Sequence, residues 1–131
     1  MASIKDRFII PKKLDNQKIE SYAERLLPFC TVYDDGEIAL GDKKLTTLEK
    51  VKLALITRYL AHELDEKIPS EVTNEELVNC LNIPRDQIIA RLKDARDEKF
   101  AIASEKGTIA LPIKIGDFLN ELELKNGDKK P

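Results

Sequence analysis

The 131-residue chain carries 24 acidic and 22 basic side chains, which give a formal net charge of −2 and a pI of about 5.5. This balance excludes a general electrostatic attraction to nucleic acid or to an anionic membrane. A hydrophobic content of 42% excludes a largely disordered chain and supplies a core for a domain of this size. The sequence shows no signal peptide and no apolar run long enough to cross a bilayer, so a cytoplasmic protein without membrane contact is expected.

The first 14 residues form a basic and apolar segment. Phe8, Ile9 and Ile10 are expected to dock as a short extended piece that Pro11 ends. A partly ordered arm and, less favoured, a nucleic-acid arm are the alternatives. A helix follows from Asp15 to Leu27, because Asp15 or Asn16 can cap it and apolar residues recur at helical spacing. Its apolar stripe consists of Ile19, Tyr22, Ala23, Leu26 and Leu27.

Residues 29–40 predict a β-hairpin. Asp35-Gly36 is a turn signal, because glycine tolerates the positive φ that a tight hairpin turn requires. If these two residues form the whole loop, Tyr33 faces Ile38 and Thr31 faces Leu40. Those four side chains would then share the face that packs on the next helix.

Residues 45–64 predict the central helix of the fold. Thr46 and Glu49 have the spacing of a capping box, and no Gly or Pro interrupts the helical pattern that follows. Apolar residues lie on most sides of this helix, whereas a surface helix has one apolar stripe. We therefore expect it to be buried between an N-terminal layer and a C-terminal one.

Short elements make up the second half of the chain. Thr73 and Glu76 repeat the capping-box spacing, and Pro84 suits the first turn of a further helix. The expected elements are a helix at 73–81, a helix at 84–99 with Ile88, Ile89, Leu92 and Ala95 on its buried face, strands at 100–103 and 108–111, and a helix at 116–124.

The segment from Val72 to Leu111, VTNEELVNCLNIPRDQIIARLKDARDEKFAIASEKGTIAL, resembles the winged helix-turn-helix superfamily. With the central helix as the first of three, the resemblance covers residues 46–111, about half of the chain, and no specific family is identified. The N-terminal helix and hairpin are not part of this pattern. With them, the whole chain is expected to have an α+β, mostly helical fold. Its parts are an arm, helix and β-hairpin at 1–44 packed on the core, a winged helix-turn-helix domain with a C-terminal helix at 45–124, and a disordered tail at 125–131.

In this superfamily the third helix lies in the major groove of DNA and the hairpin touches the backbone. The resemblance therefore implies that Gln87 and Arg91, one helical turn apart, contact bases, since Gln suits adenine and Arg suits guanine. Arg85, Lys93 and Lys106 are the expected phosphate contacts. The expected partner is double-stranded DNA, and a homodimer is expected because two modest basic patches add avidity.

The local charge opposes this interpretation. Residues 70–112 hold six basic and eight acidic side chains, and Asp94 and Asp97 lie on the predicted outer face of the third helix. If this helix does not bind DNA, its charged side chains are expected to form solvent-exposed ion pairs along it. The alternative function is a winged-helix module that binds a protein in a transcription or replication assembly, without DNA.

No motif predicts catalysis, a metal or a cofactor. The single histidine, His62, is expected to be a core or boundary residue, and Cys30 and Cys80 lack the close spacing of a metal site. The two cysteines are expected to be reduced core thiols, although the sequence leaves a disulfide open. A ligand pocket beside the central helix is a third interpretation, without a convergent polar set to support it. We therefore expect a small dimeric transcriptional regulator that is not an enzyme.

Overall fold

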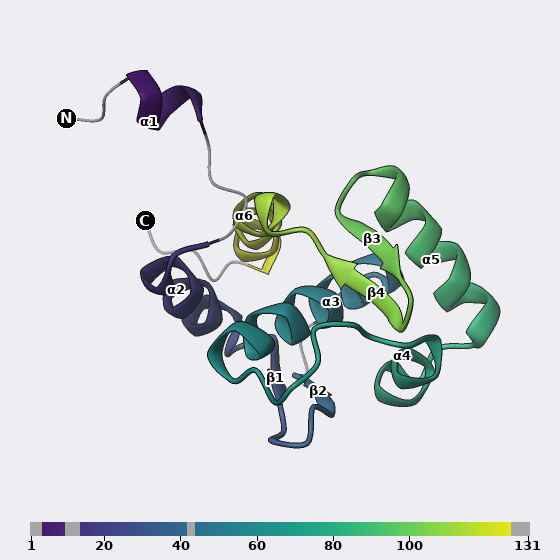
Figure 1. The fold of residues 1–131 in the computed structure, drawn as a ribbon. Helices are drawn as coiled ribbons and strands as arrows, with labels where there is room; N and C mark the ends of the chain where they lie inside the picture. Colours follow the sequence, from purple (N-terminus) through teal and green to yellow (C-terminus); the bar gives the residue numbers. More distant parts are fainter. Residues whose placement is uncertain (1–3, 10–13, 42–43, 127–131) are drawn as a thin grey trace.

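The structure, a computed structural model, describes residues 4–9, 14–41 and 44–126. The described chain is α+β and mostly helical (Figure 1). Its elements in chain order are α1 (Ile4–Phe8), α2 (Asn16–Leu26), β1 (Cys30–Val32), β2 (Ile38–Leu40), α3 (Thr47–Leu64), α4 (Asn74–Leu81), α5 (Arg85–Asp97), β3 (Ala101–Ser104), β4 (Gly107–Ala110), a 3-10 turn η1 (Pro112–Lys114) and α6 (Ile115–Asn126).

Helix α3 is the central element, as its sequence predicts. The capping box is present: Thr46 Oγ1 accepts from the Glu49 amide at 3.1 Å, and Glu49 Oε1 accepts from the Thr46 amide at 2.8 Å. Every residue from Leu53 to Leu60 is buried. Helix α3 contacts α2, both strands of the first hairpin, α4, α5 and β4, so one core joins the two halves of the chain.

The first hairpin forms, but the predicted register is wrong by one residue. Val32 pairs with Ile38, and the Tyr33 amide donates to the Glu37 carbonyl at 2.8 Å, so the loop has three residues and ends at Gly36 with φ +94°. One extra loop residue turns the side chains of β1 to the opposite face, whereas those of β2 keep the predicted face. Cys30 and Ile38 are therefore buried against the core, and Tyr33 is 59% exposed.

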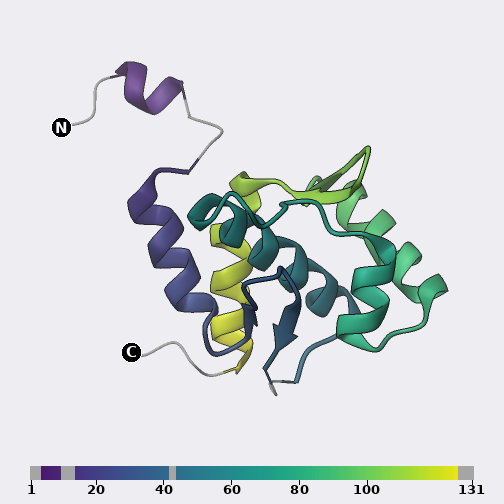
Figure 2. The ribbon, with the colours of Figure 1, turned by 60° about the horizontal axis from the view of Figure 1, so that its bottom comes forward.

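The N-terminal segment differs from the expected extended piece. Residues 4–8 form the short helix α1, which lies apart from the body of the molecule (Figures 1 and 2). Phe8 is 83% exposed and Ile9 is 63% exposed, so neither docks on the core. Ile10 and Pro11 lie outside the described residues.

The expected elements of the second half are present, with one addition. The amide of Val72 donates to the carbonyl of Thr108, and the amide of Thr108 donates to the carbonyl of Val72, both at 2.9 Å. The segment before α4 is thereby paired alongside β4, so the β3–β4 hairpin gains a third short strand position. Within the expected helix at 84–99, Ile88, Leu92 and Ala95 are buried, whereas Ile89 is 46% exposed and its predicted burial is wrong.

Helix α6 packs against α2 and closes the core. It buries Phe118, Leu119 and Leu122, as predicted. Its last residue is Asn126, so Lys125 and Asn126 are helical rather than part of a disordered tail, and 127–131 lie outside the described residues. Within residues 4–9, 14–41 and 44–126, no helix has the length and apolar character needed to cross a membrane.

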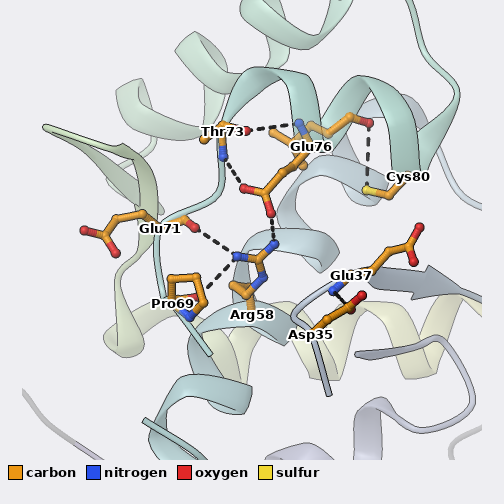
Figure 3. A network of polar contacts seen from close by, with 9 residues as sticks. Asp35, Glu37, Arg58, Pro69, Glu71, Thr73, Glu76 and Cys80 are labelled. Atoms are coloured by element: carbon orange, nitrogen blue, oxygen red, sulfur yellow. Dashed lines mark hydrogen bonds and ion pairs between the residues drawn. The ribbon is translucent and has the colours of Figure 1, made fainter. Parts of the chain in front are cut away.

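A buried arginine fixes the connection from α3 to α4 (Figure 3). Arg58 is 1% exposed; its Nη1 donates to the carbonyls of Pro69 at 3.3 Å and Glu71 at 3.1 Å, and its Nη2 pairs with Glu76. Glu76 also accepts from the Thr73 amide at 3.0 Å and so completes the capping box of α4. The guanidinium thus ties the start of α4 to the centre of the core.

His62, Cys30 and Cys80, the residues considered for catalysis or metal binding, lie in the packed body of the fold. His62 Nδ1 lies 2.6 Å from the carbonyl of Ile68, at the end of α3. Cys30 and Cys80 are free thiols, and burial is the main cause that raises the pKa of each to about 11. In the part of the chain that the structure describes, no three His, Cys, Asp or Glu side chains are grouped so that they could hold a metal ion.

Candidate nucleic-acid interface

Helix α5 is held by a short turn and one apolar face. Asn82 adopts the left-handed conformation, with φ 56°, and ends α4, and Pro84 caps the next helix without a side-chain hydrogen bond. Asn is among the residues that enter this conformation most readily, so the turn between the helices stays short. The opposite face of α5 is left to solvent.

Gln87 and Arg91 lie on one side of α5, as the sequence predicts. Gln87 is exposed, and Arg91, one helical turn later, is partly exposed. The guanidinium of Arg91 forms an ion pair with Asp94, because its Nε lies 2.9 Å from Oδ2 of that carboxylate. The arrangement can present one amide and one guanidinium to base edges, but with a carboxylate beside the guanidinium.

Two of the three predicted phosphate contacts also have acidic partners. Lys93 Nζ lies 3.0 Å from Asp97 Oδ2, and this hydrogen bond raises the pKa of Lys93. Arg85 pairs with Glu75 of α4, and the same contact lowers the pKa of that carboxyl. These side chains are mostly exposed, so the pairs contribute little to stability and a phosphate could replace the carboxylate at small cost.

The third predicted phosphate contact, Lys106, is exposed in the two-residue loop between β3 and β4. No carboxylate of the described residues pairs with it. Gly107 follows and packs so closely on the segment before α4 that a Cβ atom there would lie 2.5 Å from the Val72 carbonyl oxygen. The pairing with Val72 thereby holds the loop in place.

The structure does not gather the five predicted residues into one patch. At about 100° of rotation per residue, Lys93 lies about 120° around α5 from Gln87, and Arg85 about 160°. Gln87 and Arg91 therefore form one group, Lys93 with Asp97 a second, and Arg85 turns back toward α4.

Two basic residues that were not assigned a role stand out in the structure. Within residues 70–112, the described bases that no carboxylate pairs are Arg96, Lys99 and Lys106. Arg96 is half-buried and Lys99 is exposed with φ 59°, at the junction of α5 with β3. The sequence places Arg96 and Lys99 near the end of a predicted helix, and this was the one available sign of a role for them. It does not indicate which basic side chains lack a carboxylate partner in the folded chain.

Comparison with known proteins adds no relative. No protein-family model matches the chain, and searches of curated proteins and of solved structures find no match either.

Proposed function

We propose that residues 46–111 form a winged helix-turn-helix unit and that the chain is a small transcriptional regulator that binds double-stranded DNA. The observation that supports this most is the reciprocal pairing of Val72 with Thr108. It adds the strand that precedes α4 to the β3–β4 hairpin, so the order of elements is helix, strand, helix, helix and two-stranded wing. Helix α5 would then enter the major groove and the hairpin loop would lie on the backbone.

In this proposal, Gln87 and Arg91 contact bases, and Arg85, Lys93 and Lys106 contact phosphates. Asp94 and Asp97 remain close to the DNA, so the affinity of one subunit is modest and depends strongly on salt. Three phosphate contacts predict a slope of log K against log salt of about −2.7 per subunit.

The test is a fluorescence-anisotropy titration of mixed-sequence duplex at several salt concentrations. We expect binding at low salt that weakens with this slope, and we expect the Arg91→Glu/Lys93→Glu variant to lose it, because two attractive charges become repulsive. The matched control is Lys67→Glu/Lys114→Glu, which makes the same change of charge at exposed lysines outside α5 and the hairpin. Equal binding by wild type and the α5 variant would overturn the assignment.

A second function, binding of a protein partner without DNA, is favoured by one observation. Arg85, Arg91 and Lys93 all have carboxylate partners, and the segment 70–112 has more acidic than basic side chains. A surface of balanced ion pairs lacks the net positive charge that a phosphate backbone attracts, whereas charges of both signs can complement a protein surface. Recovery of one stoichiometric protein partner, together with no duplex binding at the lowest salt, would select this function.

A further inference from the structure

An apolar groove lies between the C-terminal end of α2, strand β1 and the second half of α3. We call it the α2–α3 groove. It has a volume of about 250 Å³, and its lining includes Ala23, Leu26, Leu27, Val32, Leu60 and Leu64. Leu27, expected on the buried stripe of its helix, is 62% exposed, and Leu64 is 56% exposed. Two large apolar side chains at this groove are therefore exposed to solvent. A contiguous exposed apolar surface is typical of a binding face.

The edge of this groove is acidic. A neighbouring hollow shares Ala23, Leu27 and Leu64 with it and adds the carboxylates of Glu20 and Glu24 on α2. Both glutamates are exposed, and no basic side chain of the described residues pairs with either. The groove therefore combines an apolar floor with negative charge along one side.

Helix α1 has the complementary properties. Ile4 and Phe8 are 74% and 83% exposed, and at four positions apart they share one side of the helix. Lys5 and Arg7 flank that side, each about 80° away at 100° per residue. The helix stands clear of the body in both views (Figures 1 and 2), and the exposure of Ile4 and Phe8 shows that no other described residue covers its apolar side.

We propose that the α2–α3 groove binds α1 of a second copy of this chain, and that the two copies exchange their arms reciprocally. Phe8 and Ile4 would fill the groove beside Leu27 and Leu64. Lys5 and Arg7 would lie against Glu20 and Glu24 of the other copy. This inference is independent of DNA binding.

A second copy is the occupant that these observations favour. Helix α1 precedes the start of α2, whereas the groove lies at the other end of α2. An exchange about a twofold axis makes the same contact twice, so it doubles the buried area of one short arm and covers both apolar surfaces of both chains. The dimer that results is weak, because each arm is short and contributes few large side chains.

The test is sedimentation equilibrium of the full chain over a wide range of concentrations. We expect a monomer–dimer equilibrium that Phe8→Asp and Leu64→Asp each weaken at least about tenfold, since each places a charge in an apolar contact. The control is Ile113→Asp, which makes the same change at a side chain that is 72% exposed and lies outside both surfaces. A chain that is monomeric throughout, or a dimer that neither variant weakens, would overturn the proposal.

A charge exchange separates the specific contact from general stickiness. Glu20→Lys/Glu24→Lys should weaken the dimer by opposing Lys5 and Arg7, and adding Lys5→Glu/Arg7→Glu in the same chain should restore it. Failure of the second pair to restore the dimer would contradict the proposed pairing. Hydrogen exchange of the groove amides is a readout besides mass. If Phe8→Asp speeds this hydrogen exchange in a chain that stays monomeric, the arm docks on its own chain and the proposed swap of arms is wrong.

Discussion

At the scale of single residues, Arg58 is the buried charged side chain of α3. It is buried in the middle of the helix and donates to two carbonyls of the polar connection, while Glu76 binds it from the first turn of α4. Sequence alone does not indicate this role, because an arginine among apolar helix residues usually reaches solvent. The contacts that bury it come from residues 11 to 18 positions later, which no local pattern encodes.

Replacement of Arg58 tests this role. Arg58→Met keeps the apolar stem but removes the donors, so the carbonyls of Pro69 and Glu71 lose a hydrogen bond and Glu76 keeps only the Thr73 amide as a donor among the described residues. We expect the free energy of unfolding to fall by about 3 kcal/mol. Urea unfolding measures the change. Lys67→Met, which removes a charge from an exposed side chain, should change it by less than about 0.5 kcal/mol. Equal stability of the two variants would mean that the Arg58 contacts contribute nothing.

The same pair predicts how stability depends on pH. Burial acts to raise the pKa of Glu76, but the hydrogen bond from the Thr73 amide and the contact with Arg58 outweigh it, and the pKa lies below its ordinary value of 4.5. A carboxyl whose pKa is lowered by folding stabilises the protein above its unfolded pKa, and this stability is lost as the pH falls through the folded pKa. The acid-induced loss should therefore be smaller in Arg58→Met than in wild type.

At the scale of elements, the helices from α2 to α6 were predictable because their signals are local, whereas α1 was expected as an extended piece. Thr46 with Glu49 and Thr73 with Glu76 form the two capping boxes that their spacing predicts. The register of the first hairpin was not predictable in this way. Asp35-Gly36 marks a turn, but the pairing of the Tyr33 amide with Glu37 decides that the loop has three residues.

The candidate interface was predictable in part for the same reason. Helical spacing predicted that Gln87 is exposed and that Ile88 and Leu92 are buried, and both hold in the structure. Spacing did not predict which carboxylate pairs with each basic side chain, because Arg91 and Lys93 each have acidic neighbours at several positions along the helix. Rotamers and the packing of α4 select among them, and these depend on the folded chain.

The third strand position is tested by Gly107→Ala. An added Cβ would lie 2.5 Å from the Val72 carbonyl oxygen, so the strand that precedes α4 must move away from β4. We expect a loss of about 2 kcal/mol of stability, as for overpacked sites, and faster amide exchange at Val72 and Thr108. Lys106→Ala, one residue earlier in the exposed loop, is the control and should leave both amides protected. Unchanged protection in the glycine variant would contradict the close packing described above.

At the scale of the whole molecule, one core joins both halves of the chain around α3. Helix α2 and the first hairpin pack on one part of that helix, and α4, α5 and β4 pack on another. Helix α6 packs on α2 and is joined to the start of α3 by the Lys125–Glu49 ion pair. The outer side of α5 and the loop with Lys106 are thereby left free, whereas the α2–α3 groove opens on the N-terminal half. The proposed DNA interface and the proposed dimer contact thus use different surfaces, and both can be occupied together.

The central claim is that the exposed side of α5 and the β3–β4 loop meet duplex DNA. The most direct measurement is an NMR titration of the isotope-labelled full chain with mixed-sequence duplex at low salt, read at each backbone amide. We predict shift changes at Gln87, Arg91 and Lys106 that disappear as salt is raised, with no change at the amides of the α2–α3 groove. Shifts confined to the groove, or no shifts at any DNA concentration, would contradict the claim.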